Sequence, residues 1–197
     1  KQKDFCEEYL CKIPREAQET VRKADESRFA CGEVFRLWSP YKSPAVLIIG
    51  GDWQGKTVAA HRAAIRLIKH FSKGARYLSA RKIASDCALM ATGTQERSWA
   101  EERLTSAYLS CRGRSIVVLD DIGRERHSDA TVSKICDYID LLYERRAACV
   151  LVTHLVGKEL TVRYGKDIVS RLCEASWITP VMVSGSDIRK TRYFFEN

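Results

Sequence analysis

One stretch decides the fold: Ala45-Val46-Leu47-Ile48-Ile49-Gly50-Gly51-Asp52-Trp53-Gln54-Gly55-Lys56-Thr57. Its first five residues form a short apolar run of the kind that makes a buried strand. The next eight satisfy the spacing G-x-x-x-x-G-K-[ST] of a phosphate-binding loop, and residues 57–69 continue with helical periodicity. Strand, loop and helix therefore follow one another in the order that a nucleoside triphosphate site requires.

The chemistry of such a site explains these residue types. Backbone N–H groups of a glycine-containing loop and of the first helical turn point at the phosphates, and the helix dipole adds positive potential. We expect Lys56 to reach the β- and γ-phosphate oxygens, and Thr57 to offer its hydroxyl to Mg²⁺. The predicted nucleotide contacts in this stretch are Gly50, Gly51, Asp52, Trp53, Gln54, Gly55, Lys56, Thr57 and Val58. The alternative is a chance match in a glycine-containing turn.

Two carboxylates follow a second apolar run, residues 115–119, and supply the other half of the predicted site. The pattern predicts a buried parallel strand whose carboxyl end faces the phosphates. We expect Asp120 to hold Mg²⁺, directly or through water, and Asp121 to orient or deprotonate the attacking water. Paired aspartates after a strand are by themselves more often a helix cap or a turn. Beside a phosphate loop, the metal-site interpretation is favoured.

Length and charge bound the organisation of the chain. Its 197 residues predict one α/β domain over residues 41–197 with a short helical appendage over residues 1–40. The appendage suits one or two amphipathic helices broken near Pro14, which either bind a partner or pack against the core. The formal charge of +8 favours a polyanionic partner. Residues 1–30 carry equal numbers of acidic and basic side chains, so the excess lies on residues 31–197.

The cysteines argue against a disulfide or zinc framework. Eight are scattered along the chain without any C-x-x-C pair, and several lie inside apolar runs. We therefore predict buried, reduced thiols, since a zinc module built from Cys6, Cys11 and Cys31 lacks an obvious fourth ligand. No signal peptide and no apolar run of membrane-spanning length is present. These features predict a cytoplasmic protein with no membrane partner.

Strands and helices alternate along the rest of the chain. Further strands are predicted at residues 76–79, 115–121, 149–153 and 177–183, and further helices at residues 82–90, 96–109 and 129–146. This alternation predicts a parallel sheet in a three-layered α/β/α arrangement with helices on both faces. Thr153 and His154 end one strand. We expect this polar tip to contact the γ-phosphate or the catalytic water, so Thr153 and His154 are both predicted nucleotide contacts. The alternative for His154 is a cap at the start of a loop.

Four ordered motifs carry a family resemblance over residues 45–190. They are the phosphate loop, residues 119–123 (Leu-Asp-Asp-Ile-Gly), the strand that ends at Thr153, and an arginine-bearing segment with Glu159-Leu160, Arg163-Tyr164-Gly165 and Ile168-Val169-Ser170-Arg171-Leu172. This combination resembles the bacterial replicative helicase loaders of the DnaC/DnaI type and the related IstB-like ATPases of transposition systems. Both belong to the AAA+ superfamily of P-loop NTPases.

The resemblance implies a five-stranded parallel sheet and a homo-oligomer, a ring or spiral, with ATP at the subunit interfaces. It implies that Arg171 is an arginine finger reaching the γ-phosphate held by a neighbouring copy. From the residues alone, we expect Arg171 to form a surface ion pair with Asp167 or Glu174 instead. Arg189, in a segment resembling the end of these domains, is a predicted nucleotide sensor. The chain departs from the family with His154 in place of asparagine and Trp53 in place of glycine.

The leading hypothesis is an ATPase that uses ATP and Mg²⁺ to assemble on single-stranded or duplex DNA and to load or remodel the replicative helicase. The alternatives are an IstB-like ATPase that coats duplex DNA and recruits a transposase, a small-molecule kinase, and a nucleotide-binding scaffold without hydrolysis. Candidate phosphate contacts to DNA are Arg62, Arg66, Lys69, Arg81, Lys82, Arg112, Arg114, Arg124 and Arg126.

Overall fold

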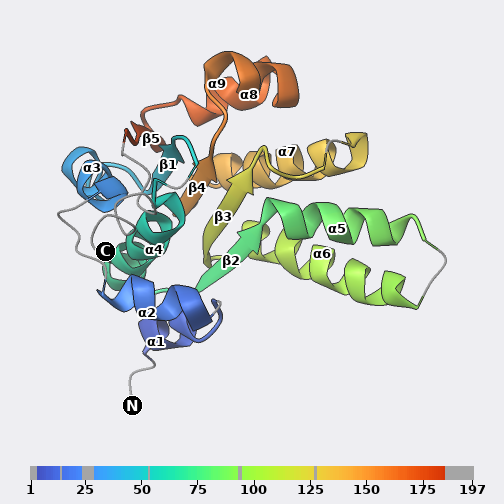
Figure 1. The fold of residues 1–197 in the computed structure, drawn as a ribbon, viewed down its shortest axis with the longest axis horizontal. Coiled ribbons are helices and arrows are strands. Elements are labelled where there is room, and N and C mark those ends of the chain that lie inside the picture. The colour runs from blue at the N-terminus through green and yellow to red at the C-terminus, as the bar shows by residue number, and fades with distance from the viewer. Residues whose placement is uncertain are drawn as a thin grey trace, which may run out of the picture.

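A five-stranded parallel sheet forms the centre of the molecule (Figure 1). The computed structural model describes residues 4–13, 15–23, 29–52, 54–92, 95–126 and 128–184. The strands are β1 (Ala45–Ile49), β2 (Ala75–Ser79), β3 (Ile116–Ile122), β4 (Cys149–Thr153) and β5 (Ile178–Met182), in the order β2-β3-β4-β1-β5. All neighbouring pairs are parallel. Each predicted strand is confirmed, as is the strand number that the family resemblance implied.

Helices fill the connections between the strands. The described residues form α1 (Phe5–Leu10), α2 (Arg15–Lys23), α3 (Phe29–Leu37), α4 (Lys56–Phe71), α5 (Ala80–Met90), α6 (Glu96–Arg112), α7 (Asp129–Glu144), α8 (Gly157–Tyr164) and α9 (Lys166–Leu172). The helices α4, α5, α6 and α7 confirm the four predicted from apolar periodicity. The sequence prediction missed α8 and α9 as helices and did not extend the N-terminal helices to α3.

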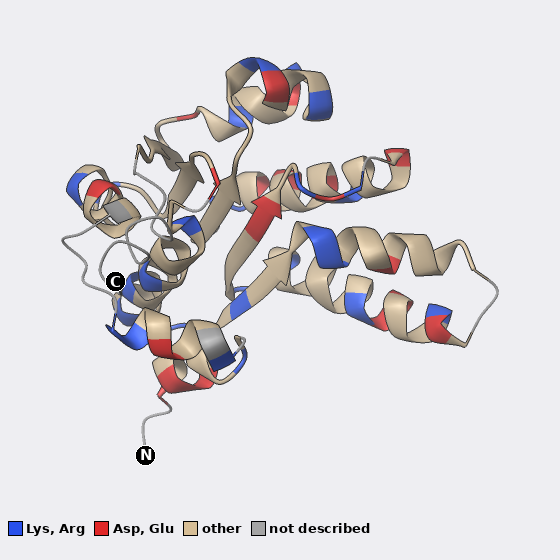
Figure 2. Cartoon of the chain, in the orientation of Figure 1, with Lys and Arg blue, Asp and Glu red and all other residues tan. Residues whose placement is uncertain are grey.

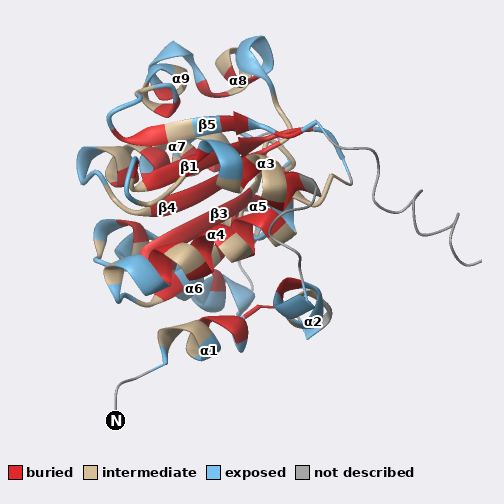
Figure 3. Ribbon diagram, turned by 90° about the vertical axis from the view of Figure 1, so that its left-hand side faces the viewer, coloured by how far each residue is buried: buried red, intermediate tan, exposed pale blue. Residues whose placement is uncertain are grey.

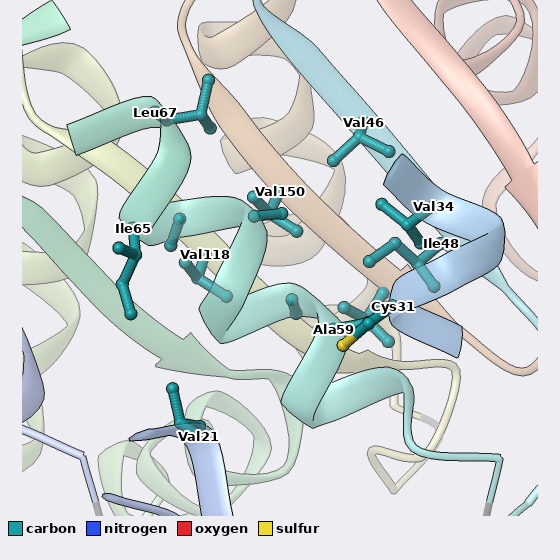
Figure 4. Close-up of a cluster of buried hydrophobic side chains, with 14 of the residues drawn as sticks. Val21, Cys31, Val34, Val46, Ile48, Ala59, Ile65, Leu67, Val118 and Val150 are labelled. Carbon is teal, nitrogen blue, oxygen red and sulfur yellow. The ribbon is translucent and has the colours of Figure 1, made fainter. Parts of the chain in front are cut away.

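Alternate residues of the strands face opposite layers, which makes two cores. On one face, Val46 and Ile48 of β1 pack with Ala59 and Leu67 of α4 and with Val34 of α3 (Figure 4). On the other face, Leu47 and Ile49 pack in a cluster with apolar residues of α5 to α9. Figure 1 shows the sheet between α3 and α4 on one side and α5, α6 and α7 on the other, and Figure 3 shows that the central strands are buried. The predicted three-layered α/β/α arrangement is confirmed.

The N-terminal helices pack on the α4 side of the sheet. Tyr9 of α1, Val21 of α2 and Val34 of α3 are each at most 1% exposed and belong to the same core cluster as α4. Trp38 follows α3, and its indole N–H donates to the Ser43 carbonyl over 3.1 Å. Of the two interpretations of this segment, packing against the core is the one that the structure shows.

A bulge interrupts the pairing of β3 with β4 where the two aspartates lie. Leu119 pairs with Leu151, but Ile122 pairs with Thr153, so β3 holds one residue more than β4 over this interval. Asp121 has φ of 62°, in the left-handed region that a non-glycine residue rarely adopts. The bulge therefore gives the carboxyl end of β3 a local backbone that a regular strand lacks.

The cysteines agree in part with expectation. Cys31, Cys111 and Cys149 are buried free thiols, whereas Cys11 and Cys173 are exposed. Within the residues that the structure describes, no group of three or more His, Cys, Asp or Glu side chains is arranged to hold a metal ion. The described helices also include none with the length and apolarity needed to cross a bilayer.

Candidate nucleotide-binding site

The loop between β1 and α4 has the backbone that phosphate binding needs. Gly55 precedes α4 with φ of 77°, a conformation that costs a side-chain-bearing residue far more than glycine. No side chain caps α4 in the described part of the chain. Since the first amides of a helix have no intrahelical acceptor, those of α4 are available to an anion.

Close packing holds the start of the loop. The Gly50 N–H donates to the Thr153 carbonyl over 3.3 Å, and the Val183 N–H donates to the Ile49 carbonyl over 2.8 Å. A Cβ at Gly50 would lie 2.5 Å from Val183 Cγ2 and 2.8 Å from the Val183 carbonyl oxygen. The loop thus begins in a space that only glycine fits, fixed to the strands on both sides of β1.

Lys56 lies inside this loop. Its ammonium group donates to the Gly51 carbonyl oxygen, and its side chain is half-buried. Burial lowers the pKa of Lys56, and the negative charges of Asp120 and Asp121 act in the opposite direction. Lys56 is therefore a half-buried cation of the loop whose charge is favoured by the two carboxylates at the end of β3.

Asp120 is the buried carboxylate of the site. It is 2% exposed, and its Oδ2 accepts hydrogen bonds from the Thr57 hydroxyl at 3.0 Å and the Tyr77 hydroxyl at 3.2 Å. The backbone N–H of Asp121 donates to Asp120 Oδ1 at 2.8 Å. Burial raises the pKa of Asp120, as does the charge of Asp121, while the three donors oppose the rise. The structure thus brings together the two predicted magnesium ligands, Thr57 and Asp120.

Asp121 lies between two guanidinium groups. Arg81 Nε lies 3.4 Å from Asp121 Oδ2, and Arg124 Nε lies 3.7 Å from Asp121 Oδ1. Arg124 also forms an ion pair with Asp52 in the phosphate loop. Sequence reasoning treated Arg81 and Arg124 only as candidate DNA contacts and missed their place beside the predicted catalytic carboxylate. No spacing rule links them to the loop in the sequence.

The end of β4 presents Thr153 and His154. The Thr153 hydroxyl donates to the Ile122 carbonyl over 2.9 Å and accepts from the Leu155 N–H over 3.0 Å, so it holds the end of β4. Thr153 is 1% exposed, and a direct contact with nucleotide stays a prediction. The capping contact at this loop start is therefore made by Thr153.

His154 has a different environment. Its Nδ1 is buried and has no hydrogen-bond partner within the described residues. Burial lowers the pKa of His154, and the positive charges of Arg124 and Lys56 lower it further. Within the described residues, this ring nitrogen makes no capping contact, and the contact of His154 with nucleotide stays a prediction.

Arg171 contacts a different part of the molecule. In the last turn of α9, it forms an ion pair with Asp140 of α7, and its guanidinium carbon lies 5.4 Å from the centre of the Tyr143 ring. The intrachain ion pair therefore goes to Asp140, not to Asp167 or Glu174 as residue spacing had suggested. The structure does not bring Arg171 together with Lys56 within one chain. Trp53 and Arg189 lie outside the described residues.

Sequence reasoning also missed a buried carboxylate clamp. Glu125 accepts from the Gly123 N–H at 2.7 Å, from Arg163 Nε at 2.8 Å and from the Tyr164 hydroxyl. Arg163 donates a further bond to the Glu125 carbonyl at 2.6 Å. The clamp ties the loop after β3 to α8. Glu125 lies in a highly charged stretch of sequence that gives no sign of burial.

Several solved structures have a similar architecture. The chain is similar to the crystal structure of the DnaC helicase loader, with 19% identity and a TM-score of 0.56 over 92% of this chain and 99% of that one. The chain shares the fold of the DnaC loader. No protein-family model and no curated protein matches the sequence.

Two DnaA structures are also similar in fold to this chain. AMPPCP-bound DnaA from Aquifex aeolicus has 19% identity and a TM-score of 0.54, over 93% of this chain and 51% of that chain. The replication initiator DnaA bound to AMPPCP and single-stranded DNA has 16% identity and a TM-score of 0.53, over 96% and 54%. The chain thus spans about half the length of these DnaA chains. These likenesses confirm the expected fold, a five-stranded parallel sheet with helices on both faces.

Proposed function

We propose that this protein is a magnesium-dependent ATPase that assembles on DNA and loads or remodels a replicative helicase. One observation carries the proposal: Thr57 Oγ1 lies 3.0 Å from Asp120 Oδ2, although 63 positions separate them in the chain. A loop hydroxyl and a carboxylate from a neighbouring strand are the ligand types that hold Mg²⁺ beside phosphates in P-loop proteins. Their meeting beside Lys56 supports a triphosphate site.

The residues present fit magnesium and a nucleoside triphosphate. The glycine-only space at Gly50, the uncapped start of α4 and the half-buried Lys56 suit the phosphates, and Thr57 with Asp120 suits Mg²⁺. When bound, Mg²⁺ would neutralise phosphate charge. Lys56 would add positive charge at the β- and γ-phosphates. Asp121, held between two guanidinium groups, would accept a proton from water or orient it.

Assembly of several copies would complete the site. Arg171 contacts Asp140 and Tyr143 of its own chain, away from the phosphate loop, so its predicted role requires a neighbouring subunit. In that role, its guanidinium would offset charge that develops on the departing γ-phosphoryl group. The match to nearly the whole DnaC chain supports this arrangement over a kinase.

A mixing experiment tests the shared site. We expect Lys56→Ala to abolish ATP binding, and Arg171→Ala to keep ATP binding while losing assembly-dependent hydrolysis. In a mixed assembly, an intact loop from one variant meets an intact Arg171 from the other, so part of the hydrolysis should return. Arg97→Ala, at an exposed position of α6, is the matched control for Arg171→Ala. No recovery, with both variants still oligomeric by light scattering, would refute the shared site.

DNA is the expected polyanionic partner. Figure 2 shows Lys and Arg spread over several helices, and some of the candidate DNA contacts already have partners inside the chain. Arg81 and Arg124 flank Asp121, Lys82 lies 3.2 Å from Asp86, and Arg66 stacks on Phe35. Within the described residues, Arg112, Arg114 and Arg126 form no ion pair and remain the better candidates.

The choice of partner is tested by measuring the ATPase rate without DNA, with single-stranded DNA and with duplex DNA, across salt concentrations. Stimulation by single-stranded DNA that weakens as salt rises supports the helicase-loading proposal. Stimulation by duplex DNA, with filaments that require ATP, would favour transposition instead. An ATPase rate that is unchanged by DNA and increased by a small metabolite would favour a kinase.

A further inference from the structure

Tyr77 is a second side-chain donor to the buried carboxylate of the site. It lies on β2, where its register partner is Val118 of β3, two residues before Asp120. The Tyr77 hydroxyl donates to Asp120 Oδ2 at 3.2 Å, beside the bond from Thr57 to the same oxygen. Because Asp120 is 2% exposed, protein donors must supply the hydrogen bonds that water gives an exposed carboxylate.

These donors also determine how the carboxylate is oriented. Oδ2 accepts from the two hydroxyls, and Oδ1 accepts from the backbone N–H of Asp121. A carboxylate with donors on both oxygens cannot rotate without losing bonds in a buried environment. Tyr77 contributes to this restraint from a strand that carries none of the predicted site residues.

A buried contact path leads from Tyr77 to the N-terminal helix. The Tyr77 ring lies against the His61 ring of α4, with 5.1 Å between their centres. His61 Nδ1 is hydrogen-bonded to the Tyr9 hydroxyl of α1 at 2.7 Å. Tyr9 and His61 are each 1% exposed. Three aromatic side chains from α1, α4 and β2 therefore connect the N-terminal helix to Asp120.

We propose that Tyr77 is a positioning residue for Asp120 in magnesium-nucleotide binding, and that Tyr9 and His61 hold the Tyr77 ring in place. The inference rests on the proposed function, because it assigns Asp120 to the magnesium site. It adds two roles: one for an edge-strand tyrosine, and one for α1, which packs against α4 and β2. Correct placement of α1 then contributes to the affinity for magnesium-bound nucleotide.

Tyr77→Phe tests the first role, because it removes one hydroxyl and keeps the ring. The measurement is isothermal titration of the full chain with ATP, once with Mg²⁺ and once with EDTA. The affinity for magnesium-bound ATP should fall about fivefold to tenfold, since one hydrogen bond to a charged group is lost. The affinity for metal-free ATP should change less than about twofold, because that ligand does not use Asp120. Tyr108→Phe, at an exposed tyrosine of α6, should change neither affinity.

Tyr9→Phe tests the second role. It should weaken magnesium-dependent binding in the same direction by about twofold to threefold, because it releases His61 without touching Asp120. The double variant Tyr9→Phe/Tyr77→Phe should bind no more weakly than Tyr77→Phe, since both changes act through one hydroxyl. Melting curves of each variant show that the fold is kept. If Tyr77→Phe does not fold, Tyr9→Phe carries the same comparison with and without metal.

The outcomes separate the two proposals. If the unaltered protein does not bind magnesium-bound ATP, the proposed function fails. If it binds and Tyr77→Phe binds equally well, or loses affinity equally with and without Mg²⁺, Tyr77 does not position Asp120. If the losses from Tyr9→Phe and Tyr77→Phe simply add, or Tyr9→Phe has no effect, the link to α1 is overturned.

Discussion

Arg124 forms an ion pair with Asp52 and thereby joins the loop after β3 to the phosphate loop. The same guanidinium lies 3.7 Å from Asp121, so one cation faces two carboxylates at the predicted site. Asp52 is a residue that places negative charge close to the phosphates, which by itself would oppose ATP binding. Arg124 neutralises that charge, which explains how this loop can carry an aspartate.

The ion pair predicts that substitutions of Asp52 and Arg124 change the affinity for ATP in opposite directions. Arg124→Gln should weaken ATP binding about tenfold, because Asp52 then repels the phosphates without compensation. Asp52→Asn should keep or improve ATP affinity, and Asp52→Asn combined with Arg124→Gln should recover most of the loss. Calorimetric titration with ATP measures all three. Melting temperatures should hardly move, because half of the Asp52 side chain is exposed. Equal losses in both single variants would contradict this account.

The Glu125 clamp predicts a large effect on stability. Glu125→Ala should lower the free energy of unfolding by about 3–5 kcal/mol, because it leaves the mostly buried Arg163 guanidinium without its partner. Glu101→Ala, at an exposed position of α6, should change it by less than about 0.5 kcal/mol. Urea unfolding of both variants provides the test. A similar small change in the two would mean that Arg163 finds water or another partner.

The sequence predicted the sheet well chiefly because its three central strands, β1, β3 and β4, are buried on both faces. Residues 45–49 and 149–153 are continuous apolar runs, and each is a strand with the predicted bounds. The helices α8 and α9 were missed because each is short and Gly165, with φ of 87°, separates them. The signal was present all the same: buried apolar residues recur every four positions at Leu160, Tyr164, Ile168 and Leu172.

The phosphate-loop half of the site was predictable for a similar reason. A fixed local spacing identifies Lys56 and Thr57, and a strand end identifies Asp120, so their meeting follows from parallel topology. The partners Tyr77 and Arg124 were not identified as such. Their contacts with Asp120 and Asp52 cross between separate elements, and single-sequence periodicity reports only which face a residue occupies. Such pairings depend on tertiary packing.

Buried His61 predicts a pH dependence of stability. Burial lowers the pKa of His61 to about 4 from its ordinary value of 6.5. Between these values the unfolded chain binds a proton that the folded chain does not, so stability falls as pH decreases from 6.5 to 4. The contribution is about 1.4 kcal/mol per pH unit, or roughly 3 kcal/mol over the window. Above pH 6.5, His61 contributes no further change.

Comparison with His61→Gln isolates this contribution, since glutamine can still form a hydrogen bond with Tyr9 but does not titrate. Urea unfolding at several values between pH 7 and pH 4.5 should give a shallower dependence for the variant than for the unaltered protein. Parallel curves would show that His61 is protonated in both states or in neither. Carboxylates that titrate in the same range are common to both proteins and cancel in the difference.

Two glycines predict contrasting results for the same substitution. Gly50→Ala would place its Cβ 2.8 Å from the Val183 carbonyl oxygen, a backbone atom fixed by the bond from the Val183 N–H to β1. The loop or the end of β5 must then shift, so ATP affinity and melting temperature should both fall. Gly157→Ala, at the first residue of α8, meets no atom within 4 Å and should keep both, with a stability gain of up to about 1 kcal/mol from helix propensity. Thermal melting with and without magnesium-bound ATP compares the two, and normal nucleotide binding by Gly50→Ala would mean that the loop does not need its close approach to Val183.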